Sequence, residues 1–347
     1  MIDSHWHLYV PYHEDGTDYR LMLDQLQKDQ GLEAMNLCCI PCYHELGPAQ
    51  NLLAAIYKLH NPTAYAYGGL VYPQIPFQNP MPEGMDPLSQ YRELMDLGFD
   101  GIKMLETKPT EQKIYGMCID DPYYDGLFAA AEADGTHMVW HVADPETFWD
   151  IDRIPQRFLD RGWYYGDGTY MSHERIYEQV YNVLDAHPQL KVSFAHFFFL
   201  SDHPQRLAEL FDKYPGTSVD VTPGSEMYGS FRENREFYRD FFEKYQDRII
   251  FGTDTSYSGG DMTRFNDRSK AVVAFLTTDQ ELEVISVPTK GLALPKPVTD
   301  KILGGNFRKA AGPAPKTIDR QKLRAYAEKY RQLIQDETIR KFIFENI

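Results

Sequence analysis

The sequence predicts an α/β fold, a (β/α)8 TIM barrel with extra C-terminal helices. Short apolar runs alternate with amphipathic helical patterns over most of the chain. Strands that alternate with helices form a parallel sheet through right-handed crossovers. The sequence contains eight such units in about 250 residues, which are the number and length typical of this barrel. A doubly wound open sheet is the competing fold, but its G-x-G-x-x-G fingerprint does not follow the first run.

The apolar runs expected as strands are regularly spaced. They cover residues 2–8, 34–42, 64–72, 99–105, 137–143, 191–198, 217–222 and 248–256. Apolar residues at helical spacing lie between them. We expect these helices at residues 18–30, 50–60, 87–97, 123–134, 175–186, 205–214 and 233–245, with a further one at 262–276.

No linker divides the chain, so we expect a single domain over residues 1–347. Prolines punctuate residues 288–315, and residues 319–344 have the pattern of one or two polar helices. Residues 280–347 are therefore expected as a helical extension packed outside the barrel. The longest insertion, residues 144–172, follows the fifth run, and loops of this length are typically lids or binding loops.

Charge and hydropathy exclude several kinds of partner. The chain has 35 Lys and Arg against 51 Asp and Glu, a formal net charge of -16, which argues against nucleic acid and anionic membranes. No apolar stretch reaches the roughly 18 residues that cross a bilayer, and the first strand begins at residue 2. A cytoplasmic protein with a small-molecule substrate is expected, and homo-oligomerisation stays open.

The first apolar run contains the motif His5-Trp6-His7. Side chains of a strand alternate between its two faces, so the two imidazoles point the same way. Imidazole is a preferred ligand of zinc and its first-row neighbours. This pair alone could still be two structural histidines.

Four further polar residues occupy the ends of later runs: Lys103, His141, His196 and Asp254. In barrels of this type the active site lies where the strands end. A single histidine there is usually structural, and a single aspartate before Thr-Ser can cap a turn. Their recurrence at corresponding places favours a divalent-metal site of three histidines and an aspartate, with an open position for water.

The sequence resembles the amidohydrolase superfamily along almost its whole length. The resemblance is carried by residues 2–7, Gly101-Ile102-Lys103, His141, His196, residues 251–254, and Gly304-Gly305-Asn306 near the end. It is closest to the amidohydrolase-2 branch of small barrel hydrolases and decarboxylases, which includes aminocarboxymuconate-semialdehyde decarboxylase.

The resemblance implies that His5, His7, His141 and Asp254 bind the metal. His196 is then either a ligand of a second metal or, in one-metal members, the residue that activates bound water. Catalytic roles are expected for His196 and Asp254 in proton handling. We expect one divalent ion rather than two, with Zn²⁺ the first expectation.

In two-metal members of the family that the sequence resembles, a carboxylated lysine on the fourth strand bridges the metals. Lys103 is therefore either such a bridge, a cation that faces substrate, or a packed side chain with its ammonium in water. Aromatic residues that follow strand ends could form the walls of a pocket for a cyclic compound. They are Tyr9, Tyr12, Phe148, Trp149, Phe197, Phe198, Tyr228 and Tyr257. An arginine in the nearby loops, Arg153, Arg157 or Arg264, could hold a substrate carboxylate. The expected substrate-binding set is Lys103, Trp149, Tyr257 and Arg264.

These features predict a metal-dependent hydrolase that cleaves an amide or lactone of a small, carboxylated cyclic compound through metal-activated water. The alternative is a metal-dependent lyase that decarboxylates a carboxylated aromatic compound without oxidation. Carbon dioxide release separates the two. A third reading is a barrel that binds a ligand or metal without turnover, and the complete ligand set argues against it.

Overall fold

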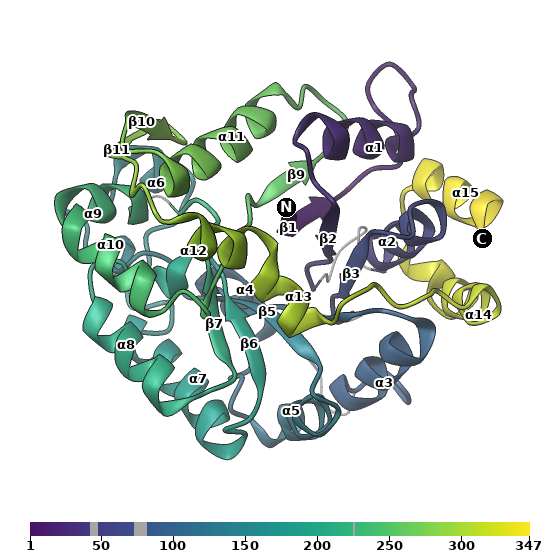
Figure 1. Ribbon diagram of the computed structural model, residues 1–347. Coiled ribbons are helices and arrows are strands. Elements are labelled where there is room, and N and C mark those ends of the chain that lie inside the picture. The colour runs from purple at the N-terminus through teal and green to yellow at the C-terminus, as the bar shows by residue number, and fades with distance from the viewer. Residues whose placement is uncertain (42–47, 73–81, 225) are drawn as a thin grey trace.

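The computed structural model describes residues 1–41, 48–72, 82–224 and 226–347. Within them, nine parallel strands form one sheet in the order β8-β7-β6-β5-β4-β3-β2-β1-β9 (Figure 1). The strands are β1 (Ile2–Leu8), β2 (Ala34–Cys38), β3 (Tyr65–Gly68), β4 (Gly101–Thr107), β5 (His137–Val142), β6 (Lys191–Phe194), β7 (Thr217–Asp220), β8 (Ile249–Ile250) and β9 (Thr255–Tyr257). The predicted α/β barrel is confirmed. The last residue of the second predicted strand, residue 42, lies outside the described part, and the third predicted strand ends just before a further gap in it.

The eighth predicted run forms two strands instead of one. β8 pairs with β7, and β9 pairs with β1, where Thr255 lies opposite Trp6. Between them, the Ser4 amide donates to the Phe251 carbonyl at 3.1 Å, and Asp254 has a left-handed φ of 53°. A residue in this conformation cannot continue a strand. The interrupted run therefore connects both ends of the sheet.

Helices surround the sheet close to the predicted positions. They are α1 (Tyr19–Asp29), α2 (Ala49–His60), α3 (Pro87–Leu97), α5 (Pro122–Asp134), α7 (His173–Ala186), α8 (Pro204–Lys213), α10 (Arg235–Lys244) and α11 (Thr263–Thr277), with the unpredicted α4 (Pro109–Tyr115) and α9 (Met227–Glu233). Local signals set their ends. The Asp86 side chain accepts from the Ser89 amide at the start of α3, and Gly98 ends it with a φ of 110°. No helix of the described residues is long and apolar enough to cross a membrane.

The long insertion, which we call the lid (residues 144–172), has its own small core. It contains a 3₁₀ turn (Glu146–Trp149) and the short helix α6 (Gln156–Leu159). Phe148, Ile154, Phe158 and Tyr165 are buried together within it. Because these side chains pack on one another, the lid is a structured element at the end of β5.

The C-terminal region begins with an antiparallel hairpin, which was not predicted. Its strands are β10 (Glu281–Val284) and β11 (Val287–Lys290), and four-residue strands with Pro288 carry too weak an alternation to stand out. The helices α12 (Lys296–Asp300), α13 (Asn306–Ala311), α14 (Arg320–Tyr330) and α15 (Glu337–Asn346) follow. α14 and α15 pack beside α2 outside the barrel (Figure 1).

A buried carboxyl group on β4 should make the stability of the fold depend on pH. Glu106 accepts hydrogen bonds from the Tyr72 hydroxyl at 3.0 Å and the Leu105 amide at 2.8 Å. Burial raises its pKa from 4.5 to about 7. The folded state therefore holds the Glu106 proton more tightly than the unfolded state does. The free energy of unfolding falls as the pH rises from 4.5 to about 7.

Glu106→Gln is neutral at every pH, so it should remove this decline. Between pH 5 and pH 8, we expect the wild-type free energy of unfolding to fall by about 2 kcal/mol more than that of the variant. Urea unfolding of both proteins at several pH values measures the difference. Parallel pH dependence of the two proteins would show that Glu106 is ionised in the folded state throughout.

Candidate metal centre and active-site cavity

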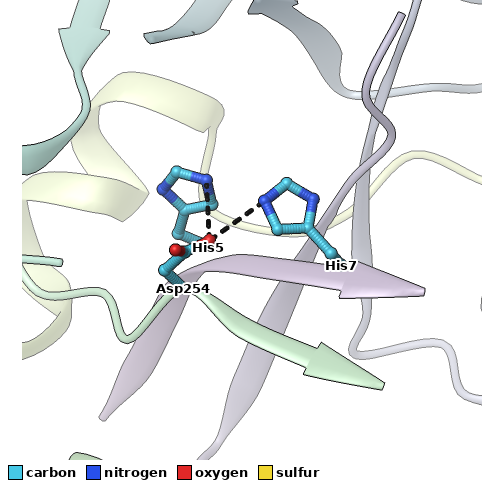
Figure 2. A group of neighbouring side chains, drawn as sticks. All are labelled: His5, His7 and Asp254. Carbon is cyan, nitrogen blue, oxygen red and sulfur yellow. Dashed lines mark ion pairs between the residues drawn. The ribbon is translucent and has the colours of Figure 1, made fainter. Parts of the chain in front are cut away.

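His5 and His7 lie on the same face of β1, which is paired between β2 and the last strand of the sheet, β9 (Figure 2). Their ring centroids are 5.0 Å apart. Both residues are buried. Because β1 is held by β2 on one side and β9 on the other, the backbone positions of the two imidazoles are set by strand pairing rather than by a loop.

Asp254 completes a group of three potential ligands. The pairing of β9 with β1 brings it beside the two histidines, with its Oδ1 at 3.1 Å from His7 Nε2 and 3.8 Å from His5 Nε2 (Figure 2). All three donor atoms lie within 4.8 Å of one another. The left-handed backbone of Asp254 directs its carboxylate, which is the kind of strain that clusters at functional sites.

Hydrogen bonds behind the histidines set their tautomers. His5 Nδ1 lies 2.9 Å from the Asp220 carboxylate, and His7 Nδ1 lies 2.7 Å from the Cys38 carbonyl. Both partners can only accept, so each Nδ1 is a donor and each Nε2 is the nitrogen that faces Asp254. This arrangement is typical of metal-binding histidines. Two nitrogen donors and a carboxylate oxygen in this orientation fit a divalent ion.

The charges of the group are suited to a cation. Burial and the Lys103 ammonium lower the pKa of His5 to about 4, so its imidazole is neutral at pH 7. Burial alone would raise the pKa of Asp254, but the hydrogen bond with His7 and the nearby imidazoles hold it well below its usual range. Metal binding requires neutral imidazoles and an ionised carboxylate, and His5 and Asp254 meet this requirement.

Lys103 on β4 reaches the same group. Its Nζ lies 2.9 Å from His5 Nε2, and the side chain is buried. Burial lowers the pKa of the Lys103 ammonium. The nitrogen that this lysine contacts is the one that would bind a metal, so the two interactions compete. Carbamate formation and a substrate contact both stay predictions for Lys103.

His196 follows β6 in an unusual turn. The run predicted as a strand to residue 198 ends at Phe194, and residues 196–199 all have positive φ, between 48° and 59°. A left-handed turn of this kind costs roughly 1–2 kcal/mol per residue. Stacking of Phe197 on Phe242 and of Phe198 on Phe194 offsets part of this cost.

The turn places the His196 ring 6.0 Å from that of His5, measured between centroids. His196 Nδ1 lies 3.2 Å from the Thr222 carbonyl, which can only accept, so Nδ1 carries a proton. Nε2 is then the basic nitrogen. Burial lowers the pKa of His196, so the ring is neutral at pH 7 and free to gain a proton.

His141 lies beside His196 with ring centroids 5.0 Å apart, but it is oriented differently from the other histidines. Its Nε2 lies 3.0 Å from the Ala143 carbonyl and 3.5 Å from the Asp144 carboxylate. It is therefore outside the three-residue group, and Nδ1 is the nitrogen left for a metal. Metal ligation by His141 stays a prediction.

These residues line a cavity of about 540 Å³ at the carboxyl ends of the strands. The floor is polar, and the lid supplies an aromatic wall. The lining residues are His5, His7, Tyr9, Ile40, Lys103, Leu105, Lys108, His141, Asp144, Pro145, Phe148, Arg157, Phe158, Arg161, Trp163, His196, Phe199, Pro223, Gly224, Asp254, Ser256 and Ile285. A cavity of this size suits a small organic molecule.

Three of the predicted substrate-binding residues lie outside this lining. Trp149 turns to another part of the lid, where its Nε1 donates to the Met171 carbonyl. Tyr257 is fully buried in β9. The Arg264 guanidinium lies over the Phe265 ring, 4.6 Å from its centroid. Among the aromatic residues expected as walls, Tyr9 and Phe148 do line the cavity.

Asp220 is a residue of the site that the sequence did not single out. It is buried at the end of β7, where Oδ2 accepts from His5 Nδ1 and Oδ1 accepts from the His196 amide at 2.8 Å. It joins the metal group to the His196 turn. The available signal was an aspartate between two valines in an apolar run, Val219-Asp220-Val221, since a buried charge there needs a partner.

Asp220→Asn should weaken metal binding without removing a ligand. An amide cannot accept from both His5 and His196 as the carboxylate does, so the His5 tautomer is less firmly held. We expect a loss on the order of 10- to 100-fold in affinity for zinc. Competition with a chromogenic chelator measures it, with Ser218→Ala on the same strand as the control. Unchanged affinity would mean that Asp220 does not orient His5.

Residues 2–310 match the family model described as Amidohydrolase. The chain therefore belongs to the amidohydrolase family, which confirms the resemblance seen in its sequence. No curated protein matches it.

Solved structures of decarboxylases share its fold. A 2,6-dihydroxybenzoate decarboxylase in complex with 2,6-dihydroxybenzoate is similar with a TM-score of 0.56 and 15% identity, over 89% of this chain and 98% of that chain. 5-Carboxyvanillate decarboxylase from Sphingomonas paucimobilis is similar with a TM-score of 0.51 and 15% identity, over 89% of this chain and 98% of that chain. A dihydroxybenzoic acid decarboxylase from Polaromonas, with bound manganese and the inhibitor 2-nitroresorcinol, is similar with a TM-score of 0.51 and 15% identity. The similarity covers 89% of this chain and 96% of that chain.

Proposed function

We propose that the protein is a metal-dependent decarboxylase that removes a carboxylate from a carboxylated aromatic compound without oxidation. The observation that carries the proposal is the His5, His7 and Asp254 group at the floor of a cavity with aromatic and cationic walls. The three decarboxylases of the same fold support it. Hydrolysis of an amide or lactone, which the sequence favoured first, has less support because these structures are lyases.

His5, His7 and Asp254 would hold one divalent ion, with His141 as a further ligand if its ring turns. Zinc suits two imidazoles and a carboxylate, and manganese is bound in one of the similar structures. When bound, the ion supplies positive charge that fixes the oxygen atoms of the substrate and stabilises negative charge as it develops. The apolar rings of the lid would hold the aromatic ring against this floor.

The reaction consumes one proton for each carbon dioxide released. The ring carbon that bears the carboxylate gains a proton, the carbon–carbon bond breaks, and its electrons return to the ring. His196 is the group proposed to carry this proton, because its Nδ1 is held by the Thr222 carbonyl and its Nε2 can take a proton from solvent. Asp254 stays ionised beside it and favours the protonated imidazole by its charge.

Product analysis tests the proposal against hydrolysis. Protein with a verified metal content is incubated with a panel of hydroxybenzoates and, separately, with N-acyl aminobenzoates and aromatic lactones. We expect carbon dioxide and the decarboxylated arene from the first panel, loss of activity with a chelator, and recovery with zinc or manganese. Acid release from the second panel without carbon dioxide would establish a hydrolase instead.

A further inference from the structure

Two arginines of the lid, Arg157 and Arg161, line the active-site cavity. They lie four residues apart, one within α6 and one just after it. The Arg157 guanidinium lies 4.7 Å from the centroid of the Phe158 ring, and that of Arg161 lies 5.5 Å from the Trp163 ring. Both rings also line the cavity. The arginines therefore belong to the same wall as the aromatic side chains.

The positive charge of these arginines is not neutralised by the protein. Within the described residues, neither guanidinium forms an ion pair with a carboxylate. Lys108, which lines the same cavity, does pair with Asp144, with 2.6 Å between Nζ and Oδ2. Both arginines are exposed, so their guanidinium groups are accessible to a ligand that enters the cavity. The two guanidinium groups can therefore pair with an anionic group of a bound ligand.

The two arginines lie against aromatic rings of the lid that pack on one another. Phe158 and Trp163 stack at an interplanar angle of 9°, and the Tyr165 hydroxyl donates to Asp144 at 2.7 Å. A guanidinium that already rests on a ring has less freedom to lose when it binds. Its fork of N–H donors matches a carboxylate in a bidentate geometry.

We propose that Arg157 and Arg161 form a subsite for a second carboxylate of the substrate, which is therefore an aromatic dicarboxylate. One carboxylate would bind the divalent ion that the His5, His7 and Asp254 group is proposed to hold at the floor, and the other is held by the lid. This inference rests on the proposed function for the first carboxylate, whereas the subsite itself rests on the lid. The two arginines then determine which carboxylated compounds the cavity selects.

Calorimetric titration of the full-length, zinc-loaded protein tests the subsite without turnover. The probes are benzoate, benzene-1,3-dicarboxylate and benzene-1,4-dicarboxylate. We expect wild type to bind one of the dicarboxylates about ten-fold or more tightly than benzoate. Arg157→Gln/Arg161→Gln should lose this preference and bind benzoate as wild type does. Arg153→Gln is the matched control, because Arg153 is an exposed lid arginine that lines a separate hollow.

Equal affinity for benzoate and both dicarboxylates, or a preference that survives the double substitution, would overturn the subsite. So would the absence of measurable dicarboxylate binding in protein with a verified metal content. Binding and turnover separate the two proposals. If the dicarboxylate preference depends on the arginines but no carbon dioxide is released, the subsite stands and the decarboxylase proposal fails.

Discussion

An Asp254→Asn variant is expected to lose its divalent ion and, with it, a factor of at least about 10³ in turnover. The carboxylate is the one negatively charged member of the three-residue group, with Oδ1 at 3.1 Å from His7 Nε2. Asparagine has the same shape and tolerates the left-handed backbone at this position. The fold should therefore persist while the neutral amide binds a cation poorly.

Metal analysis and turnover of the dialysed variant measure this effect. Asp261→Asn is the matched control, because Asp261 is exposed and its side chain accepts from the Thr263 amide at the start of α11. It removes the same charge from the same region without touching the group. An Asp254→Asn protein that still holds a full equivalent of metal would show that this aspartate is not a ligand.

A His196→Asn variant is expected to keep its metal and lose a factor on the order of 10² to 10⁴ in turnover, the usual contribution of a positioned acid–base group. The three-residue group stays intact, and asparagine accepts the φ of 56° that His196 adopts. Excess metal should not restore activity. His141→Asn is the informative comparison, because a loss of metal ligation there should be partly reversed by added metal.

The proposed role of His196 also predicts the direction in which turnover changes with pH. Burial lowers the pKa of His196 below its usual 6.5, and the proposed reaction uses the protonated ring. Wild-type turnover should therefore fall as the pH rises through this pKa, and the His196→Asn profile should lack that limb. Depletion of metal in His196→Asn, with rescue by added metal, would instead identify His196 as a ligand and favour two ions.

Features that depend on near neighbours in the chain could be predicted from the sequence. The bounds of α3 and α5 follow from an aspartate cap, a proline in the first turn and a glycine at the end, all within one helix length. The common direction of His5 and His7 follows from the alternation of a strand. The choice of Asp254 as a site residue followed from the repeat of strands and helices, as did the fold class, although the break between β8 and β9 at this residue was not predicted.

Contacts between residues far apart in the chain were decided only by the tertiary structure. Asp220 supports His5 across 215 positions, and Thr222 sets the His196 tautomer across 26. The left-handed turn at His196 is supported by aromatic packing from distant helices, so its apolar sequence resembles a continuing strand. Arg157 and Arg161, not Arg264, line the cavity because α6 packs on the aromatic core of the lid. Local propensity determines the elements, whereas the partners of buried polar groups depend on how those elements meet in space.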